Sequence, residues 1–263
     1  MLFYFSATGN SLAATRQIAS KMNDEYVSIL DCLDAQRFRF HFAEGEKIGF
    51  IFPCYFWGCP SIVTSFIAKL DASDFENRFV FIVMTCGSIT GSALSDSVRL
   101  FAMKGIRISA AHRVLMPENY VIFFNVPSED KLRRRLVKSD RTLAQIIHSI
   151  YEKGDTHLPT PLSRLLALPS RAFHGYYLKH RSTAPFHVSN KCIHCGLCAQ
   201  ICPSHAIRME NNRPTWHGAC TQCLGCLNRC PIAAINYGRK TQKRGRYVHP
   251  DGMGRTSSPG RAN

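Results

Sequence analysis

Eight of the twelve cysteines in this sequence fall into two copies of a single spacing. The spacing is C-x2-C-x2-C-x3-C-P, and the second copy follows the first at an offset of 28 residues. An iron-sulfur cube needs four thiolates at its corners, and three cysteines separated by two residues can reach three of them from one tight loop. The fourth thiolate has to come from elsewhere. The pattern therefore predicts two cluster-binding loops, formed by Cys192, Cys195, Cys198 and Cys202 and by Cys220, Cys223, Cys226 and Cys230.

The two motifs resemble those of bacterial-type two-cluster ferredoxins. In those proteins the cysteine before each proline binds the cluster of the other copy. The resemblance implies two [4Fe-4S] clusters with crossed ligands. Cluster one would then be held by Cys192, Cys195, Cys198 and Cys230, and cluster two by Cys220, Cys223, Cys226 and Cys202.

Two other uses of these cysteines are open to the sequence. Structural zinc also binds C-x2-C pairs, but it uses two separated pairs, and a third cysteine at the same short interval followed by C-P departs from that spacing. A disulfide framework belongs to oxidising compartments. Eight cysteines packed this densely, in a chain that does not open on a secretory leader, favour a reducing compartment and hence iron-sulfur ligation.

Size and hydropathy point to a two-module protein. The chain has 263 residues and a mass of 29.6 kDa, which is long for one module. Its first residues lie in an apolar run without a positive leader region, and no window approaches the roughly 18 consecutive apolar residues of a membrane span. We therefore expect a cytoplasmic protein without a transmembrane segment.

The formal net charge of +15 is unevenly distributed. Residues 1–125 hold as many acidic as basic side chains, whereas residues 186–263 hold 11 Lys and Arg against 2 Asp and Glu. A positive field around the cysteine motifs predicts redox partner proteins with acidic surfaces, and salt should weaken their attraction. Nucleic-acid binding is a further interpretation that rests on charge alone, and no nucleic-acid partner is expected.

Near the N-terminus the sequence predicts a site for an anion. Residues 2–6 form a buried strand and lead into a turn of Ser, Thr and Gly, after which apolar residues recur at helical spacing. Free amides and the positive end of a helix dipole meet at such a turn. The turn resembles the first loop of flavodoxin, [S/T]-x-T-G-x-[S/T], which wraps the phosphate of FMN. That resemblance assigns phosphate binding to Ser6, Thr8, Gly9, Asn10 and Ser11.

Strands and helices then alternate along the chain. We expect further strands over residues 26–30, 47–53, 79–85 and 107–115, and helices over residues 61–70, 91–104 and 129–152. Five strands alternating with helices indicate an α/β fold with a doubly wound, five-stranded parallel sheet, which is the size and plan of flavodoxin. A small α+β two-cluster ferredoxin domain should follow.

Ligands of such sheets bind beyond the carboxyl ends of the strands. The loop after the third strand contains Pro53, Tyr55, Phe56 and Trp57, and consecutive aromatics on a loop suggest that they cover a flat apolar ring. The loop after the fourth strand offers Thr85, Gly87 and Ser88, which suit the polar edge of a flavin. Many flavodoxins stack an aromatic from this later loop on the ring, and this sequence has none there.

The remaining cysteines are Cys32, Cys54, Cys59 and Cys86. Each is expected to serve as a small buried hydrophobe, because reactivity requires an exposed thiol of lowered pKa. A redox role is the alternative for the three that lie in the predicted flavin loops.

The expected organisation has four parts. They are a flavodoxin-like domain at residues 1–125, a helical connector and linker at 126–184, a ferredoxin domain at 185–238, and a basic tail at 239–263 whose Gly, Ser and Pro content predicts disorder.

Taken together, the two modules resemble the flavodoxin and ferredoxin fusion proteins of anaerobic bacteria and archaea. The resemblance implies an electron-transfer protein that relays electrons between FMN and two [4Fe-4S] clusters. No triad, pair of catalytic carboxylates or substrate motif accompanies the cofactor motifs, so no catalytic residue is assigned. A flavin-dependent iron-sulfur oxidoreductase acting on a small molecule is the alternative, and a nucleic-acid-binding iron-sulfur protein is a more distant one.

Overall fold

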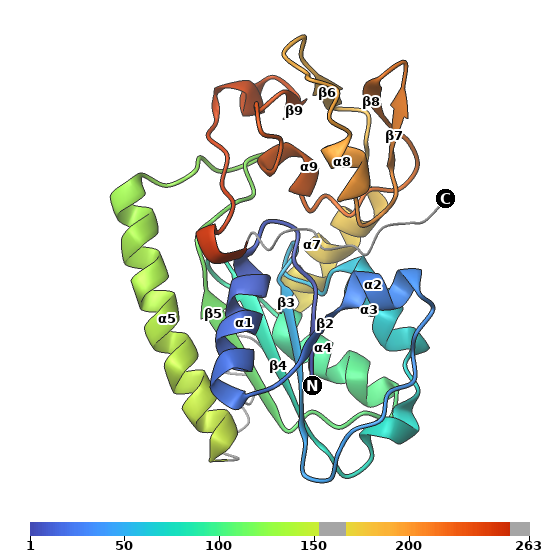
Figure 1. Cartoon of the computed structure of the whole chain (residues 1–263), viewed down its shortest axis with the longest axis vertical. Helices are drawn as coiled ribbons and strands as arrows, with labels where there is room; N and C mark the ends of the chain where they lie inside the picture. The colour runs from blue at the N-terminus through green and yellow to red at the C-terminus, as the bar shows by residue number, and fades with distance from the viewer. Residues whose placement is uncertain (153–166, 253–263) are drawn as a thin grey trace.

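The computed structural model of the chain describes residues 1–152 and 167–252. Its first half is built on a parallel sheet with the strand order β2-β1-β3-β4-β5 (Figure 1). Phe3 of β1 lies opposite Val27 of β2 and Phe50 of β3. The strands are β1 (Leu2–Tyr4), β2 (Tyr26–Ser28), β3 (Lys47–Pro53), β4 (Phe79–Cys86) and β5 (Ala110–Leu115).

Helices cover both faces of this sheet, as expected for a doubly wound fold (Figure 1). One face packs against α2 (Ile29–Asp34), α3 (Ser61–Lys69) and α4 (Ala93–Met103). The other face packs against α1 (Asn10–Met22) and α5 (Glu129–Tyr151). Alternate residues of each central strand enter opposite cores, so that Phe50 faces one layer and Ile51 the other. The predicted α/β fold is confirmed.

The second strand is shorter than the sequence suggests. Residues 26–30 are expected to form it, but β2 ends at Ser28 and α2 begins at Ile29. The reason is local, because the Ser28 hydroxyl accepts a hydrogen bond from the amide of Asp31 at 3.2 Å and caps the helix.

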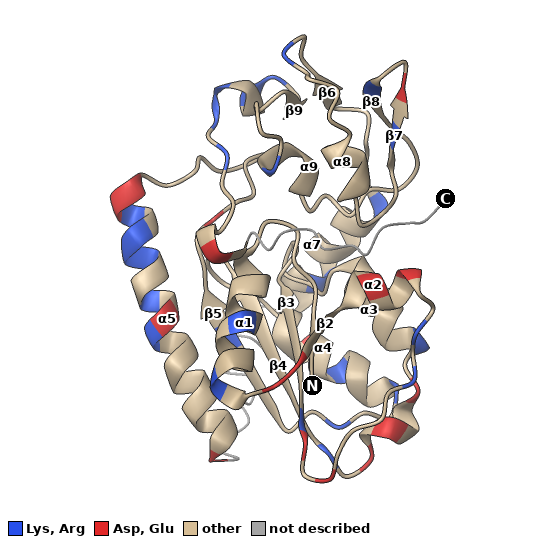
Figure 2. Ribbon diagram, in the orientation of Figure 1, with Lys and Arg blue, Asp and Glu red and all other residues tan. Residues whose placement is uncertain are grey.

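The long helix α5 belongs to the sheet rather than to a separate connector. Its side chains Leu143, Ile146, Ile147 and Ile150 are buried in the same core as Ile18 of α1. The opposite side of α5 is strongly basic near its N-terminal end, where Lys and Arg gather in Figure 2. This packing carries the first unit beyond residue 125, because an amphipathic helix of this length must bury its apolar side.

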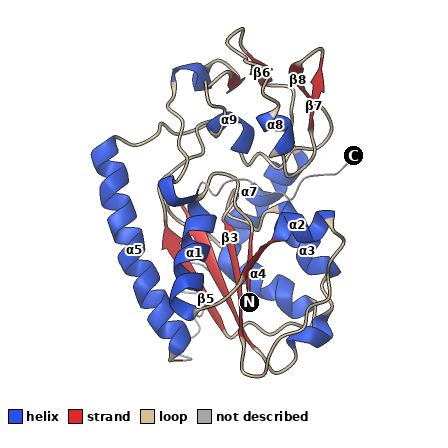
Figure 3. Ribbon diagram, viewed as in Figure 1, coloured by secondary structure: helices blue, strands red, loops and turns tan. Residues whose placement is uncertain are grey.

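A small α+β unit follows α7 (Ala167–Lys179), as Figure 3 shows. It contains two antiparallel ribbons, β6 (Phe186–Val188) with β9 (Ile235–Tyr237) and β7 (Ile207–Glu210) with β8 (Arg213–Trp216). The short helices α8 (Leu197–Gln200) and α9 (Gly225–Asn228) lie between them. Three of the cluster-motif cysteines are part of its buried core, together with Leu227 and Ile235.

The segment after β9 does not behave as the sequence predicts. Disorder is expected from residue 239 onward, yet residues 239–252 are described and include the 3-10 turns η2 (Lys240–Lys243) and η3 (Pro250–Gly252). A third such turn, η1 (Ala72–Phe75), precedes β4. The prediction is wrong for residues 239–252, because Thr241, Tyr247 and His249 are buried against the rest of the protein. None of the described helices is long and apolar enough to span a bilayer.

Replacing Phe50 with alanine should strongly destabilise the sheet. Phe50 is fully buried, and its ring centroid lies 5.0 Å from that of Phe3 and 4.6 Å from that of Phe101. We expect Phe50→Ala to lower the free energy of unfolding by about 3 to 5 kcal/mol, measured by denaturant titration. Met103→Ala is the control, because Met103 is 79% exposed and its truncation should change stability by no more than about 0.5 kcal/mol.

Candidate cofactor sites

The turn between β1 and α1 lies at the N-terminal end of a helix. Gly9 adopts a φ of +97°, which favours glycine, and its amide donates to the Ser6 hydroxyl at 3.2 Å. The hydroxyls of Ser11 and Thr85 are 2.8 Å apart. No acidic residue lies in the first turn of α1, so the positive end of its dipole is not compensated by a carboxylate of the helix itself. The turn can therefore receive a phosphate.

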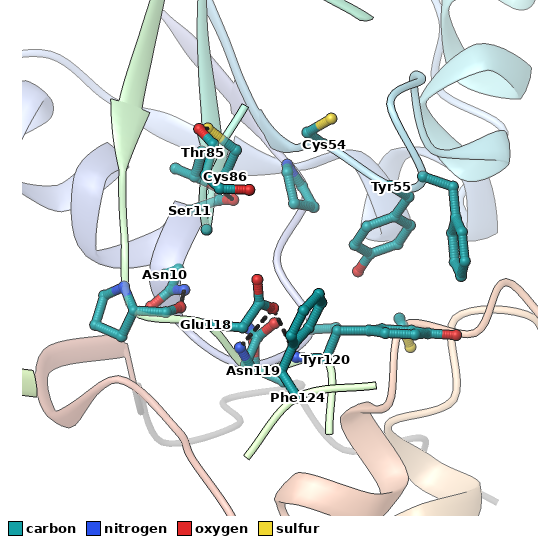
Figure 4. A pocket seen from close by; sticks show the side chains of 18 of the residues that line it. Asn10, Ser11, Cys54, Tyr55, Thr85, Cys86, Glu118, Asn119, Tyr120 and Phe124 are labelled. Carbon is teal, nitrogen blue, oxygen red and sulfur yellow. Dashed lines mark hydrogen bonds between the residues drawn. The ribbon is translucent and has the colours of Figure 1, made fainter. Parts of the chain in front are cut away.

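This turn forms one end of a cavity of about 350 Å³, which is within the range of small-molecule and cofactor sites. Around the cavity lie eleven of the twelve residues predicted to bind FMN. They are Ser6, Thr8, Asn10, Ser11, Pro53, Tyr55, Phe56, Trp57, Thr85, Gly87 and Ser88. Gly9 is the exception, because it supports the turn from behind and faces Gly252. Figure 4 shows Ser11 and Thr85 on one side of the space and Tyr55 on the other. The donors at one end fit the phosphate of FMN, and the aromatic rings at the other end fit its flavin ring.

The aromatic loop after β3 is a tight turn in an unusual conformation. Tyr55 and Gly58 exchange two backbone hydrogen bonds of 3.0 Å, and both residues between them have positive φ, 50° for Phe56 and 57° for Trp57. Left-handed backbone at a bulky residue costs about 1 to 2 kcal/mol. Packing from outside the sheet must offset this cost.

Helix α7 supplies that packing. The ring of Tyr177 stacks on Phe56 with centroids 4.2 Å apart, and Phe173 packs against Trp57 at 5.3 Å. The Nδ1 atom of His174 lies 3.1 Å from the carbonyl oxygen of Tyr55. Burial lowers the pKa of His174, so that neutral imidazole donating this hydrogen bond is favoured. Phe56 thus both packs under the loop and lines the cavity, which unites the two roles open to loop aromatics.

Several residues around the cavity are absent from the sequence-based assignment. The segment after β5 contributes Glu118, Asn119, Tyr120, Phe123 and Phe124, and α7 contributes Phe173. Residues 116–127 are recognisable as an apolar patch between prolines, and they follow the carboxyl end of the last strand. That position is the signal that could have placed them at the site. Aromatics that the loop of Thr85 to Gly91 lacks are thus brought from elsewhere in the chain.

The carboxylate of Glu118 is fixed by its own loop. One carboxylate oxygen accepts hydrogen bonds from the amides of Asn119 at 3.0 Å and Tyr120 at 2.9 Å. The other lies so close to Gly87 that a side chain at position 87 would collide with it. The side-chain amide of Asn119 in turn donates to the Thr8 hydroxyl. The loop after β5 is therefore hydrogen-bonded to the loop after β1 and lies against the loop after β4.

The cysteines of the two motifs lie in two groups. One small cavity is lined by Cys192, Cys195, Cys198 and Cys230, and another by Cys202, Cys220, Cys223 and Cys226. Each group contains three cysteines of one motif and the cysteine that precedes the proline of the other, which is the crossed grouping implied by the resemblance. No three His, Cys, Asp or Glu side chains among the described residues are arranged to hold a single metal ion. A four-iron cube is larger than one ion, and four thiols around each cavity fit it.

The two cysteine groups differ in burial. Cys202, Cys220 and Cys226 are buried, whereas Cys195 is exposed and no member of its group is fully buried. We call the group of Cys220 the inner group and that of Cys195 the outer group. Burial raises the pKa of Cys220 to about 11, so metal binding there would have to displace a proton.

The inner group is in contact with the large cavity. Cys223 lines both the inner cysteine cavity and the cavity between Thr8 and Tyr55. A Cβ atom added at Gly225 would lie 3.4 Å from the carbonyl oxygen of Ala7, so the loop of Cys223 also approaches the turn of Ser6 to Ser11. The two sites therefore share a wall.

Hydrogen bonds join the halves of the molecule around this wall. The Tyr177 hydroxyl donates to the carbonyl oxygen of Thr221 at 2.6 Å. The Tyr120 hydroxyl donates to the side-chain oxygen of Gln222 at 3.0 Å. Burial raises the pKa of Tyr177 to about 12, and both phenols remain protonated donors at neutral pH. The position of Cys223 relative to the cavity is fixed by these bonds.

The cysteines outside the motifs are poorly suited to redox chemistry. Burial raises the pKa of Cys86 to about 11 and that of Cys59 to about 12, and it raises that of Cys54 further. A thiol with such a pKa is protonated at neutral pH and reacts slowly. Cys32 is buried in the core beside Ile29. Packing is therefore the role that their surroundings favour.

Comparison with known proteins agrees with this division of the chain. A model of flavodoxin domains matches residues 1–113, and a model of 4Fe-4S dicluster domains matches residues 181–235. The sequence-based recognition of a flavodoxin-like module followed by a ferredoxin module is confirmed. Pyruvate synthase subunit PorD of Methanocaldococcus jannaschii is 35% identical over 57 residues, which are 21% of this chain and 66% of that protein.

Two solved structures were also found to be similar. Megasphaera elsdenii flavodoxin aligns with 43% of this chain and 82% of its own, at 17% identity and a TM-score of 0.32. The rubredoxin oxygen:oxidoreductase of the anaerobe Desulfovibrio gigas aligns with 55% of this chain and 35% of its own, at 14% identity and a TM-score of 0.33.

A single substitution tests the crossed grouping of the cysteines. We expect Cys202→Ala to remove the metal bound by Cys220, Cys223 and Cys226, although Cys202 belongs to the other motif. Iron and sulfide counts per chain should fall by about half, because the outer group keeps all four thiolates. Cys230→Ala is the matched variant and should empty the outer group instead. Loss of the outer cluster in the Cys202 variant would show that the ligands do not cross.

Proposed function

Because this chain joins a flavodoxin domain to a 4Fe-4S dicluster domain, we propose that it is an electron relay. FMN occupies the large cavity, and one [4Fe-4S] cluster is held by each cysteine group. The observation that carries this proposal is that Cys223 lines the flavin cavity and the inner cysteine cavity at once. A wall shared in this way gives the two cofactors the close approach that electron transfer needs.

In this proposal the turn of Ser6 to Ser11 binds the FMN phosphate through backbone amides and hydroxyls. Tyr55, Phe56 and Trp57 lie along the flavin ring, and Thr85, Gly87 and Ser88 bind its polar edge. Phe123 and Phe124 cover the ring from the segment after β5. The bonds of Ser11 to Thr85 and of Asn119 to Thr8 fix these groups before the cofactor arrives. Such preorganisation reduces the entropy lost on binding.

Together these cofactors would couple two kinds of electron transfer, since a flavin exchanges electrons singly or in pairs and each cluster passes one at a time. The burial of the two cysteine groups indicates the order in which electrons would pass through the clusters. The inner group borders the flavin cavity and is mostly buried, whereas the outer group includes the exposed Cys195 beside Ile193, which is 58% exposed. Electrons would therefore pass between flavin and partner through the inner cluster first and the outer cluster second.

The partner would be a protein with an acidic surface. Lys191 is exposed next to Cys192 of the outer group, Arg208 of β7 is also exposed, and Figure 2 shows further basic residues on the loops around β9. Only two acidic residues are present in the whole of residues 186–263. A positive field of this kind attracts an acidic partner to the outer cluster, and the association rate should fall as salt is raised.

Two variants test the order of the relay. Cys195→Ala should leave flavin and the inner cluster in place and able to exchange electrons, but electron delivery to an added ferredoxin should fall at least tenfold because the outlet is lost. Cys220→Ala should isolate the flavin from the ferredoxin as well. The measurement is anaerobic stopped-flow absorbance of flavin and clusters, with iron and flavin counted in each variant.

The relay is contradicted if Cys220→Ala, with its flavin intact, still passes electrons to the ferredoxin at the rate of the unaltered protein. That outcome would mean that the flavin communicates with the partner directly.

A second candidate function is reduction of a small molecule at the flavin. The observation in its favour is that Phe123 and Phe124 are 58% and 53% exposed while lining the cavity, so that an apolar aromatic compound could reach its mouth. This function predicts steady-state turnover of quinones or nitro-compounds, and Phe124→Ala should raise KM severalfold. Absence of turnover, together with rapid reduction by another ferredoxin, would leave the relay as the function.

A further inference from the structure

Residues 244–252 form a strap that returns from the iron-sulfur domain to the flavodoxin domain. The chain passes from β9 through η2, runs toward α1, and reaches η3 beside that helix (Figure 1). We call these nine residues the C-terminal strap. The strap lies outside both family matches, which end at residues 113 and 235.

The C-terminal end of the strap lies on the turn of Ser6 to Ser11. The amide of His249 donates to the carbonyl oxygen of Thr8 at 2.9 Å. Gly252 packs directly on Gly9, since a Cβ atom added at Gly252 would lie 2.3 Å from the Gly9 Cα atom. The Arg16 guanidinium of α1 donates to the carbonyl oxygen of Asp251 at 2.5 Å. The turn is thus supported from the side opposite the cavity.

Tyr247 connects the turn with the inner cysteine loop. Its hydroxyl donates to the side-chain oxygen of Asn10, the first residue of α1, at 3.2 Å. Its backbone amide donates to the side-chain oxygen of Asn228 at 3.2 Å. Asn228 belongs to α9, which also carries Cys226, and its side-chain amide donates to the carbonyl oxygen of Asn119. Tyr247 is only 5% exposed, so water competes little for these bonds.

The near end of the strap is anchored in the iron-sulfur domain. The Arg246 guanidinium donates to the carbonyl oxygen of Ile235 at 3.0 Å and to the side-chain oxygen of Asn236 at 2.9 Å, both in β9. The Arg244 guanidinium donates to the carbonyl oxygen of Val121 at 2.7 Å. Displacement of β9 would therefore move the strap, and the strap would move the turn.

We propose that the C-terminal strap positions the turn of Ser6 to Ser11 and thereby couples FMN retention to the folding of the iron-sulfur domain. Tyr247, His249 and Gly252 are positioning residues in this role. The inference rests on the proposed function, because it assumes that FMN occupies the cavity. Coupling of this kind is reciprocal, so that FMN binding also stabilises the strap on the turn.

The test compares FMN affinity in three forms of the chain, each reconstituted anaerobically. A chain ending at residue 246 keeps the anchoring bonds of Arg246 but lacks Tyr247 to Gly252. A chain ending at residue 252 is the control, because it retains the whole strap. We expect the first form to bind FMN about 5- to 150-fold more weakly than the full chain, and the control to bind equally well. Quenching of flavin fluorescence gives the dissociation constant, and iron counts verify the clusters.

Point variants separate positioning from folding. Gly252→Val should weaken FMN binding severalfold, because its side chain would collide with Gly9, and Tyr247→Phe should do so to a smaller extent by removing one hydroxyl. Tyr26→Phe is the matched control for the loss of a hydroxyl, at an exposed site of the flavodoxin domain. Circular dichroism and iron content should be unchanged in all three variants.

Two failures can be told apart. If the full chain binds no FMN, the proposed function itself is wrong. If the full chain binds FMN and the chain ending at residue 246 binds it with the same affinity and the same dissociation rate, the strap has no positioning role and the relay proposal is unaffected.

Discussion

The contact on which this structure depends is the one between the loop of Cys223 and the carboxyl edge of the parallel sheet. A flavin site and a cysteine group can exchange electrons efficiently only when little protein separates them, and here a single residue lines both cavities. Gly225 lies at this contact, because a Cβ atom at this position would be in van der Waals contact with the carbonyl oxygen of Ala7 at 3.4 Å. The rest of the interface serves to keep the two modules in this register.

Three segments outside the two family matches maintain that register. Helix α7 holds the aromatic turn through Phe173, His174 and Tyr177, and Tyr177 also bonds to the cysteine loop at Thr221. The segment after β5 bonds to the same loop through Tyr120. The strap joins the turn at Thr8 to α9. The modules are therefore tied together at each end of the flavin cavity and behind it.

Local patterns were sufficient to predict much of this arrangement. The cysteine spacing gives the two motifs, and the resemblance to two-cluster ferredoxins implies the crossed groups that line the two small cavities. The apolar run of β3 gives its bounds of Lys47 to Pro53 without error. The cavity residues after β5 follow no comparable motif, because Phe123 and Phe124 line the cavity only once the segment after β5 has packed beside α7. The strap was misjudged for a related reason. Its glycines and basic residues suggest a solvated chain, whereas its order depends on Tyr247 and on backbone bonds to residues more than 200 positions away.

The unequal exposure of the two cysteine groups also determines how the proposed relay would fail. Cys195 is exposed to dissolved oxygen or peroxide, whereas Cys220 is buried. Oxidative damage would begin at the outer cluster. A damaged molecule would keep its flavin and inner cluster but lose electron transfer to the partner. Such a molecule could no longer pass electrons to its partner. Repair would have to rebuild only the outer cluster.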